Sequence, residues 1–286
     1  MWLTLIVLMW GSAFPLVKVA LLELAPVTLG FLRFLIATPI LLLYSYLKDG
    51  RGVKTVLTNN LRPLLVMGMT GVMGYQVFQN IGVEYTSATN SSIIISSNPI
   101  VLTLLSIPLL KEKVSATRAL GMAIGFSGVL TIILSGSQGL SPGSSSLLGD
   151  VLSFMGGLSW AIYSLVSRRR GAAGNPIGLT AASTAFGTLF LILPMFILEN
   201  PRLPTTITVW AIVVILGLGA SCLAYTLWNK VLSEEEASKA GISLFLIPAV
   251  TATLSVLLLS EPLTLPLLVG MGLVLAGVFL AERSGT

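Results

Sequence analysis

The sequence predicts an all-α integral membrane protein with ten transmembrane helices, arranged as two inverted five-helix repeats. Three observations lead to this fold class. Of the 286 residues, 55% are hydrophobic and only 9% are charged, whereas soluble domains contain about 25% charged residues. The apolar residues form long runs, and the residues that interrupt these runs recur one half-chain later. The Lys and Arg residues gather at one set of run ends, as the positive-inside rule requires of a membrane protein.

A membrane-spanning helix requires about 20 mostly apolar residues. The runs that fit this length are residues 1–22, 26–47, 62–83, 89–109, 117–134, 149–168, 177–198, 207–230, 239–259 and 263–281. We expect helices, because the strands of a membrane barrel are only about ten residues long. The first run follows Met1 without a basic region or a cleavage site, so it is interpreted as a helix and not as a signal peptide. The longest connections are 48–61 and 135–148.

Residues that are rare in an apolar background recur at a nearly constant spacing. The pairs separated by 149 or 150 positions are Trp10/Trp160, Lys18/Arg168, Pro26/Pro176, Tyr75/Tyr225, Glu84/Glu234, Ala88/Ala237, Pro99/Pro248, Glu112/Glu261, Gly121/Gly270 and Gly128/Gly277. Their shared order predicts a duplication. We expect a first five-helix repeat at 1–134, a linker at 135–148 and a second repeat at 149–286.

Five helices per repeat is an odd number, so the second repeat must enter the membrane from the opposite side. If the N-terminus is cytoplasmic, thirteen Lys and Arg residues fall on the cytoplasmic side, and Arg202 alone falls in an outside loop. Short cytoplasmic loops carry such an excess of cations. We therefore predict a multi-pass membrane protein with both termini in the cytoplasm.

Several chemistries find no support in the sequence. There is no His, Cys222 is the single cysteine, and no two carboxylates face each other within the predicted spans. We therefore predict no enzyme, no catalytic residue, no metal site and no cofactor. The net charge of +5 is spread over helix ends, so nucleic acid is not an expected partner. The carboxylates fall at helix ends or in loops, which favours a facilitator or exchanger over a proton-driven pump.

Polar and aromatic side chains at helical spacing predict a cavity for a small solute. Amide groups in hydrocarbon need partners, so these helix faces should point inward. The candidate substrate-binding residues are Trp10, Phe14, Tyr75, Gln76, Gln79, Asn80, Asn98, Trp160, Tyr163, Ser164, Tyr225, Trp228 and Asn229. Helix–helix hydrogen bonding without a ligand is the alternative explanation for each residue. Aromatic walls with few charges suit neutral, zwitterionic or partly apolar substrates.

Two prolines and one arginine complete the candidate site. Pro99 and Pro248 interrupt predicted helices at matched positions, which favours hinge or gating elements, with a packing kink as the alternative. Arg33 lies about seven residues inside its helix, and an intramembrane cation of this kind is a candidate partner for a substrate carboxylate. Pairing with Glu23 or Glu84, or extension to the membrane surface, explains it equally well. We expect Lys18 to extend to the surface.

Glycines 121, 125 and 128, with their counterparts 270 and 277, form small-residue stripes of the kind that allow close helix contact. The stripes fit packing of the fifth and tenth helices within one chain, and they fit a homodimer contact equally well.

A set of short motifs runs along the chain: Trp10-Gly11-Ser12-Ala13-Phe14-Pro15, Arg33-Phe34, Ala88, Pro99, Glu112 and the three glycines of the fifth helix. In these motifs the chain resembles the EamA family of the drug/metabolite transporter superfamily. The resemblance covers essentially the whole chain. It implies an inner (plasma) membrane transporter, commonly an exporter of amino acids or other small metabolites, with the fifth and tenth helices outside a central cavity. The second half departs from the pattern, because Ser183 replaces the arginine of the second helix and Ser159-Trp160-Ala161 replaces Trp-Gly-Ser.

The resulting hypothesis is a secondary transporter that exports or exchanges small metabolites by alternating access. A membrane sensor or assembly subunit without transport is the first alternative. An intramembrane enzyme is the second.

Overall fold

The computed structural model describes residues 2–49, 52–96, 98–110, 115–134, 145–171, 175–236, 240–241 and 243–283, and every element in these ranges is helical. The first half contains α1 (Trp2–Ala20), α2 (Pro26–Asp49), α3 (Gly52–Met67), η1 (Gly68–Gly74), α4 (Tyr75–Tyr85), α5 (Ala88–Ile95), α6 (Asn98–Leu110) and α7 (Ala116–Leu134). The second half contains α8 (Ser145–Gly171), α9 (Pro176–Leu198), α10 (Ile207–Ile215), η2 (Leu216–Leu223), α11 (Ala224–Glu234), η3 (Ser243–Leu246), α13 (Ile247–Leu259) and α14 (Leu265–Arg283).

Five described helical runs are long and apolar enough to cross a membrane. They are Trp2–Ala20, Pro26–Lys48, Ala88–Leu105, Pro176–Leu198 and Ile207–Glu234. Two shorter apolar helices, Ile247–Leu259 and Leu265–Ala281, accompany them. The prediction of an all-α membrane protein is confirmed at this level.

The predicted connection 48–61 is wrong, because α3 begins at Gly52 and continues through η1 and α4 to Tyr85. The first turns of α3 carry polar residues such as Lys54, Asn59 and Asn60, so a criterion based on apolarity missed them. The predicted linker 135–148 overlaps the start of α8, and the division into two repeats stays a prediction. Residues 145–148 belong to α8, and residues 135–144 lie outside the described ranges.

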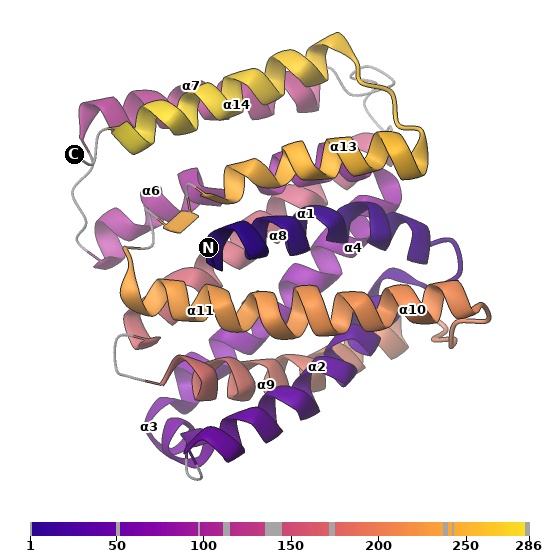
Figure 1. Ribbon diagram of the computed structural model, residues 1–286, viewed down its shortest axis with the longest axis vertical. Helices are drawn as coiled ribbons and strands as arrows, with labels where there is room; N and C mark the ends of the chain where they lie inside the picture. Colours follow the sequence, from indigo (N-terminus) through magenta and orange to yellow (C-terminus); the bar gives the residue numbers. More distant parts are fainter. Residues whose placement is uncertain are drawn as a thin grey trace.

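The helices pack as a layered bundle. In Figure 1, α7 and α14 lie side by side along one edge, and α2, α3 and α9 lie at the opposite edge. Between these edges, α1, α4, α8 and α11 form the centre of the molecule. The centre is where the predicted site residues come together.

The pairing of α7 with α14 depends on glycine. A Cβ atom on Gly277 would lie 2.4 Å from the carbonyl oxygen of Gly121, and one on Gly128 would lie 2.5 Å from that of Gly270. The glycine stripes are therefore used for packing inside one chain. The homodimer stays a prediction.

The two prolines begin helical segments. Pro99 is the second residue of α6, and Pro248 is the second residue of α13, which follows the short 3-10 segment η3. Proline is tolerated in the first turn of a helix, where its missing N–H group has no helical partner. Ser97 lies outside the described residues, and η3 leads directly into α13, so the predicted helix interruptions at the two prolines stay a prediction. The gating role stays a prediction.

Two π-helical segments occur at matched places in the two halves. The segment η1 leads directly into Tyr75, and η2 ends two residues before Tyr225. Both segments are rich in glycine, with Gly68, Gly71 and Gly74 in η1. Segments of this kind occur frequently at functional sites, and nothing in the hydrophobic pattern of the sequence predicts them.

The α7–α14 contact predicts the outcome of a glycine substitution. We expect Gly277→Ala to force the two helices apart and to destabilise the protein by about 1–3 kcal/mol, which lowers the melting temperature by several degrees. The control is Gly272→Ala on the same helix, where an added Cβ meets no atom within 4 Å. Thermal unfolding in detergent measures both variants. Equal melting temperatures would contradict the close packing of α7 on α14.

Candidate functional site

An aromatic cluster occupies the centre of the bundle. The ring of Trp160 on α8 lies 5.1 Å from that of Trp10 on α1, 5.0 Å from Tyr225 on α11 and 5.2 Å from Tyr75 on α4, measured between centroids. The contacts with Trp10 and Tyr225 are edge-to-face, an arrangement that aromatic quadrupoles favour. Four helices from both halves thus meet around one indole.

A small cavity of about 30 Å³ lies within this cluster. Its lining residues are Trp10, Phe14, Tyr75, Ile95, Ser96, Asn98, Trp160, Tyr225, Leu244 and Ile247. A single water needs about 10–15 Å³, and drug-sized ligands occupy about 300–1,000 Å³. The cavity therefore has room for water but not for a metabolite in this conformation.

The lining consists largely of residues that are equivalent in the two halves. The pairs at a spacing of 149 or 150 residues are Trp10/Trp160, Tyr75/Tyr225, Ile95/Leu244 and Asn98/Ile247. The cavity thus lies where corresponding elements of the two halves meet.

The predicted binding residues divide into two groups. Trp10, Phe14, Tyr75, Asn98, Trp160 and Tyr225 line the cavity. The residues outside its lining are Gln76, Gln79, Asn80, Tyr163, Ser164, Trp228 and Asn229, all of which are buried. Substrate binding stays a prediction for both groups.

Sequence reasoning missed four lining residues, Ile95, Ser96, Leu244 and Ile247. Three of them are apolar and do not differ from lipid-facing positions in composition. The repeat spacing was the available signal, because Leu244 corresponds to Ile95 and Ile247 corresponds to Asn98.

A hydrogen-bond network holds α11 against α8 and α9. The Asn229 side-chain amide donates to the Tyr163 hydroxyl at 2.6 Å and to Thr180 Oγ1 at 2.7 Å, and the Trp228 indole donates to Ser164 Oγ at 3.1 Å. These bonds satisfy buried polar groups between helices. They fit the alternative explanation given for these residues, which is helix–helix hydrogen bonding without a ligand.

Two cavity-lining rings are anchored on the π segments. The Trp10 indole donates to the Ala220 carbonyl in η2 at 3.1 Å, and the Tyr225 hydroxyl donates to the Gly71 carbonyl in η1 at 2.7 Å. The π segments therefore fix the orientation of the rings that surround the cavity.

Arg33 is buried, with 3% of its surface exposed. Its Nε donates to Ser221 Oγ in η2 at 3.3 Å, and its Nη1 has no hydrogen-bond partner within the described ranges. The phenols of Tyr225 and Tyr75 are its electrostatic neighbours. Extension to the surface is therefore wrong for this residue, and the carboxylate of Glu23 is engaged by α10 instead.

Lys18 also differs from its prediction. Its Nζ donates to the carbonyls of Val83 and Thr86 at 2.6 and 2.7 Å and so caps the end of α4. Arg168, its counterpart 150 residues later, donates to the Leu232 carbonyl at the end of α11 at 3.0 Å. Both cations stabilise helix C-termini, where the backbone carbonyls lack helical partners.

We call the end of the bundle where α1 begins the Trp2 end and the opposite end the Glu23 end. Three carboxylates at the Glu23 end bind backbone N–H groups at helix starts in the other half. Glu23 accepts from Thr205 and Thr206, Glu199 from Val27 and Thr28, and Glu261 from Ala88 and Thr89. Anionic groups favour helix N-termini, so these contacts join the two halves at the Glu23 end.

Asp150 is a fourth carboxylate at the Glu23 end. It lies in the second turn of α8 and is buried. Its Oδ1 accepts from the Thr86 hydroxyl at 2.7 Å, and its Oδ2 has no partner among the described side chains. The Glu23 end therefore contains a buried carboxylate beside the link between α4 and α5.

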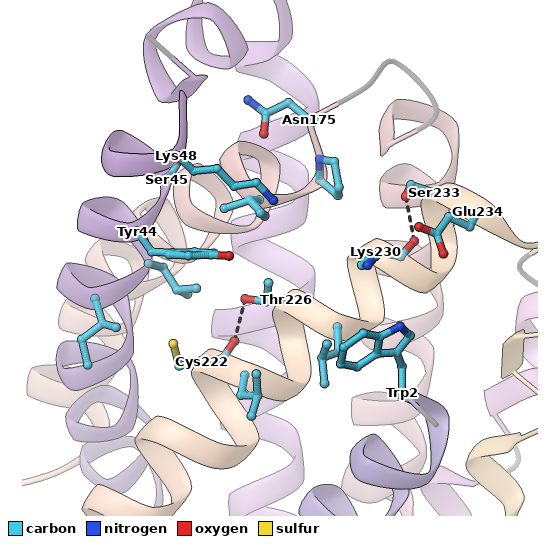
Figure 2. Close-up of a pocket in the computed structure, with 16 residues that line it drawn as sticks. Trp2, Tyr44, Ser45, Lys48, Asn175, Cys222, Thr226, Lys230, Ser233 and Glu234 are labelled. Atoms are coloured by element: carbon cyan, nitrogen blue, oxygen red, sulfur yellow. Dashed lines mark hydrogen bonds between the residues drawn. The ribbon is translucent and has the colours of Figure 1, made fainter. Parts of the chain in front are cut away.

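A larger pocket of about 910 Å³ opens at the Trp2 end, between α2, α9 and α11. Figure 2 shows Lys48 and Tyr44 on one wall and Lys230, Glu234 and Trp2 across from them. The Lys230 ammonium lies 5.0 Å above the centre of the Trp2 ring, a cation–π contact. The two ends thus differ in what the described residues show, since carboxylate contacts join the halves at the Glu23 end and a pocket opens at the Trp2 end.

Comparisons with known proteins indicate the class of protein to which the chain belongs. The EamA-like transporter family matches residues 1–134 and 147–283. An "Uncharacterized transporter" of Archaeoglobus fulgidus is 32% identical over 98% of this chain and 97% of its own length. The "Uncharacterized transporter YyaM" of Bacillus subtilis is 29% identical over 95% of this chain and 89% of its own.

A "Probable terminal-alkyne amino-acid exporter" of Streptantibioticus cattleyicolor is 27% identical over 98% of this chain and 92% of its own length. A solved crystal structure has the same fold, with a TM-score of 0.78 at 19% identity over 99% of this chain and 96% of that one.

These findings define a multi-pass membrane transporter and not an enzyme. The chain belongs to the EamA-like transporter family.

The Glu23 contacts predict a pH dependence. Hydrogen bonds, above all from the Thr206 hydroxyl and then from Thr205, lower the pKa of Glu23 from 4.5 to about 2. A depressed pKa stabilises the folded state above the unfolded value, and this contribution is lost as the pH falls from about 4.5 towards 2. We expect Glu23→Gln to lower the melting temperature at pH 7, and the difference from wild type to shrink at pH 3.

Glu235→Gln, at an exposed position, is the matched control and should not change the melting temperature at pH 7. A gap between wild type and Glu23→Gln that stays the same at both pH values would contradict the assignment.

Proposed function

We propose that the protein is a secondary transporter that exports or exchanges small metabolites by alternating access. The single observation that carries this proposal is the cavity lined by four pairs of equivalent residues, because transporters built from inverted repeats bind substrate where the repeats meet. The first repeat spans 1–134 and the second 149–286. Together they supply ten transmembrane helices.

Further contacts support an inverted repeat. Thr38 and Thr188, which are 150 residues apart, share a hydrogen bond of 2.8 Å between α2 and α9. The glycine contacts between α7 and α14 are also reciprocal, since Gly121 meets Gly277 and Gly128 meets Gly270. Equivalent residues that meet each other in this way are expected around a pseudo-two-fold axis.

The difference between the two ends supports alternating access. In this interpretation the Glu23 end faces outward and is closed, and the pocket at the Trp2 end is the cytoplasmic vestibule. Opening of the Glu23 end requires the carboxylate contacts of Glu23, Glu199 and Glu261 to break. Pro99 and Pro248, at the start of α6 and α13, are the proposed hinges.

The substrate class follows from the lining. Aromatic rings and one amide suit neutral, zwitterionic or partly apolar solutes of amino-acid size. The relative described as a probable terminal-alkyne amino-acid exporter supports amino acids as a first panel.

The orientation is tested with reporter fusions. We expect a fusion at Gly171, the end of α8, to be cytoplasmic and one at Pro201, between α9 and α10, to be external, because the cations gather at the Trp2 end. Alkaline phosphatase activity measures external placement and green fluorescence measures cytoplasmic placement. An external signal at Gly171 would overturn the proposed orientation.

Transport is tested in proteoliposomes that are loaded with labelled amino acids, without a pH gradient and in sodium-free buffer. We expect solute flux down its gradient. The double variant Glu23→Cys/Thr205→Cys, made in a Cys222→Ala background, should lose flux when a short bifunctional thiol crosslinker holds the Glu23 end closed.

The uncrosslinked double variant is the control, and each single cysteine variant should be insensitive to the crosslinker. Unchanged flux after complete crosslinking would contradict alternating access at this end. Absence of flux for every solute in the wild-type protein would favour a sensor or assembly subunit.

A further inference from the structure

We propose that Arg33 binds the carboxylate of the solute, so that the substrates are amino acids or other small carboxylates with an apolar body. This inference rests on the proposed transport function and narrows its substrate class. It assigns the recognition of charge to one residue outside the aromatic lining.

The first argument is the state of the guanidinium. Arg33 is 3% exposed, yet its hydrogen bond to Ser221 Oγ is long at 3.3 Å. Its Nη1 lacks a partner in the described part of the chain. A buried charge without a counter-ion is costly, and ionisable groups within spans commonly belong to the substrate pathway. A bound carboxylate would supply the missing acceptor and the missing charge.

The second argument is the position of Arg33 beside the cavity. Tyr75 and Tyr225 line the cavity, and the same two phenols are the electrostatic neighbours of Arg33. Phe34, the next residue, packs edge-on to Tyr225 with the ring centroids 5.3 Å apart. A solute in an enlarged cavity would reach the guanidinium by passing between these two phenols.

The third argument is the route from the Trp2 end. The pocket there is lined by Cys222, which follows Ser221, and by Ile40, which lies about two helical turns beyond Arg33 on α2. Lys48 and Lys230 also line this pocket, together with the single carboxylate of Glu234. Two cations at the mouth and one further in would draw an anionic group along the path between α2 and α11.

The charge count selects a carboxylate. Phosphate esters are typically held by several cations or donors, whereas the interactions described around Arg33 include no second cation. Its counterpart in the other half, Ser183, is neutral and donates to the Thr180 carbonyl. A solute with one carboxylate at one end and an apolar group at the other therefore fits the cavity in a single orientation.

The test compares acids with their amides. The probes are L-leucine and L-leucinamide, L-phenylalanine and L-phenylalaninamide, and benzoate and benzamide, added to the purified full-length protein. Trp10 and Trp160 line the cavity, so quenching of tryptophan fluorescence reports binding. We expect at least one acid to bind about tenfold more tightly than its amide, since hydrogen bonds to charged groups are the stronger ones.

In Arg33→Gln the acid and its amide should bind about equally. Arg33→Lys should retain part of the preference for the acid, because the positive charge remains. Arg169→Gln, at an exposed arginine on α8, is the control and should behave as wild type. Equal binding of acids and amides by the wild-type protein would overturn the inference, even if the Arg33 variants do not fold. So would a preference that persists in Arg33→Gln.

The outcomes separate this inference from the proposed function. Carboxylate binding that depends on Arg33, with no flux in proteoliposomes, would support the site and contradict transport. Flux of neutral solutes at the same rate as their acids would support transport and overturn the role of Arg33.

Discussion

Hydrocarbon offers no hydrogen bonds, so every polar group of a membrane-embedded chain must find its partner inside the protein. This constraint accounts for much of the structure. The Asn229 amide joins α11 to α8 and α9, the Trp10 indole reaches a carbonyl of η2, and Lys18 collects the carbonyls at the end of α4. At the Glu23 end, glutamates satisfy the first N–H groups of helices in the opposite half. The two halves are therefore joined by polar groups that neither half satisfies alone.

The polar atoms that escape this pairing mark the places where water or solute is expected. Within the described residues, Ser96 Oγ lacks a partner and lines the central cavity, and Ser45 Oγ lacks one and lines the pocket at the Trp2 end. Arg33 Nη1 also lacks a partner there, and the electrostatic neighbours of Arg33, Tyr75 and Tyr225, line the central cavity. These three atoms lie along the proposed route from the Trp2 end to the centre. Other buried atoms without a partner among the described residues line neither space; they are Gln76 Nε2, Asn80 Oδ1, Asp150 Oδ2 and Ser255 Oγ. The aromatic cluster closes the proposed route in the present conformation, because it leaves only about 30 Å³ of free space.

The sequence predicted the helices best where apolar runs and repeated residues agree, as at Pro26–Asp49 and Pro176–Leu198. It missed the start of α3, because hydropathy does not reveal a polar helical extension. For the site, Trp10, Tyr75, Trp160 and Tyr225 were found from spacing alone. Trp228 and Asn229 share that spacing but lie outside the cavity lining and bond to neighbouring helices, and their role in binding stays a prediction. Whether a residue lines the cavity or bonds to another helix depends on which face of its helix it lies on. Contacts with residues more than 40 positions away in the sequence determine this. Leu244 and Ile247 could have been found only by applying the repeat to their partners.

The replacement of Arg33 by Ser183 in the second half has an evolutionary consequence. A symmetric pair of identical five-helix chains would carry either two buried guanidinium groups around one cavity or none. Two guanidinium groups would repel each other and would require two anions. A cavity with no guanidinium group would lack a partner for a single carboxylate. Covalent fusion of the halves removes this restriction, since each copy can then vary by itself. Under the proposed role of Arg33, one serine in place of one arginine gives the cavity a polarity, so that an asymmetric molecule would bind in one direction only.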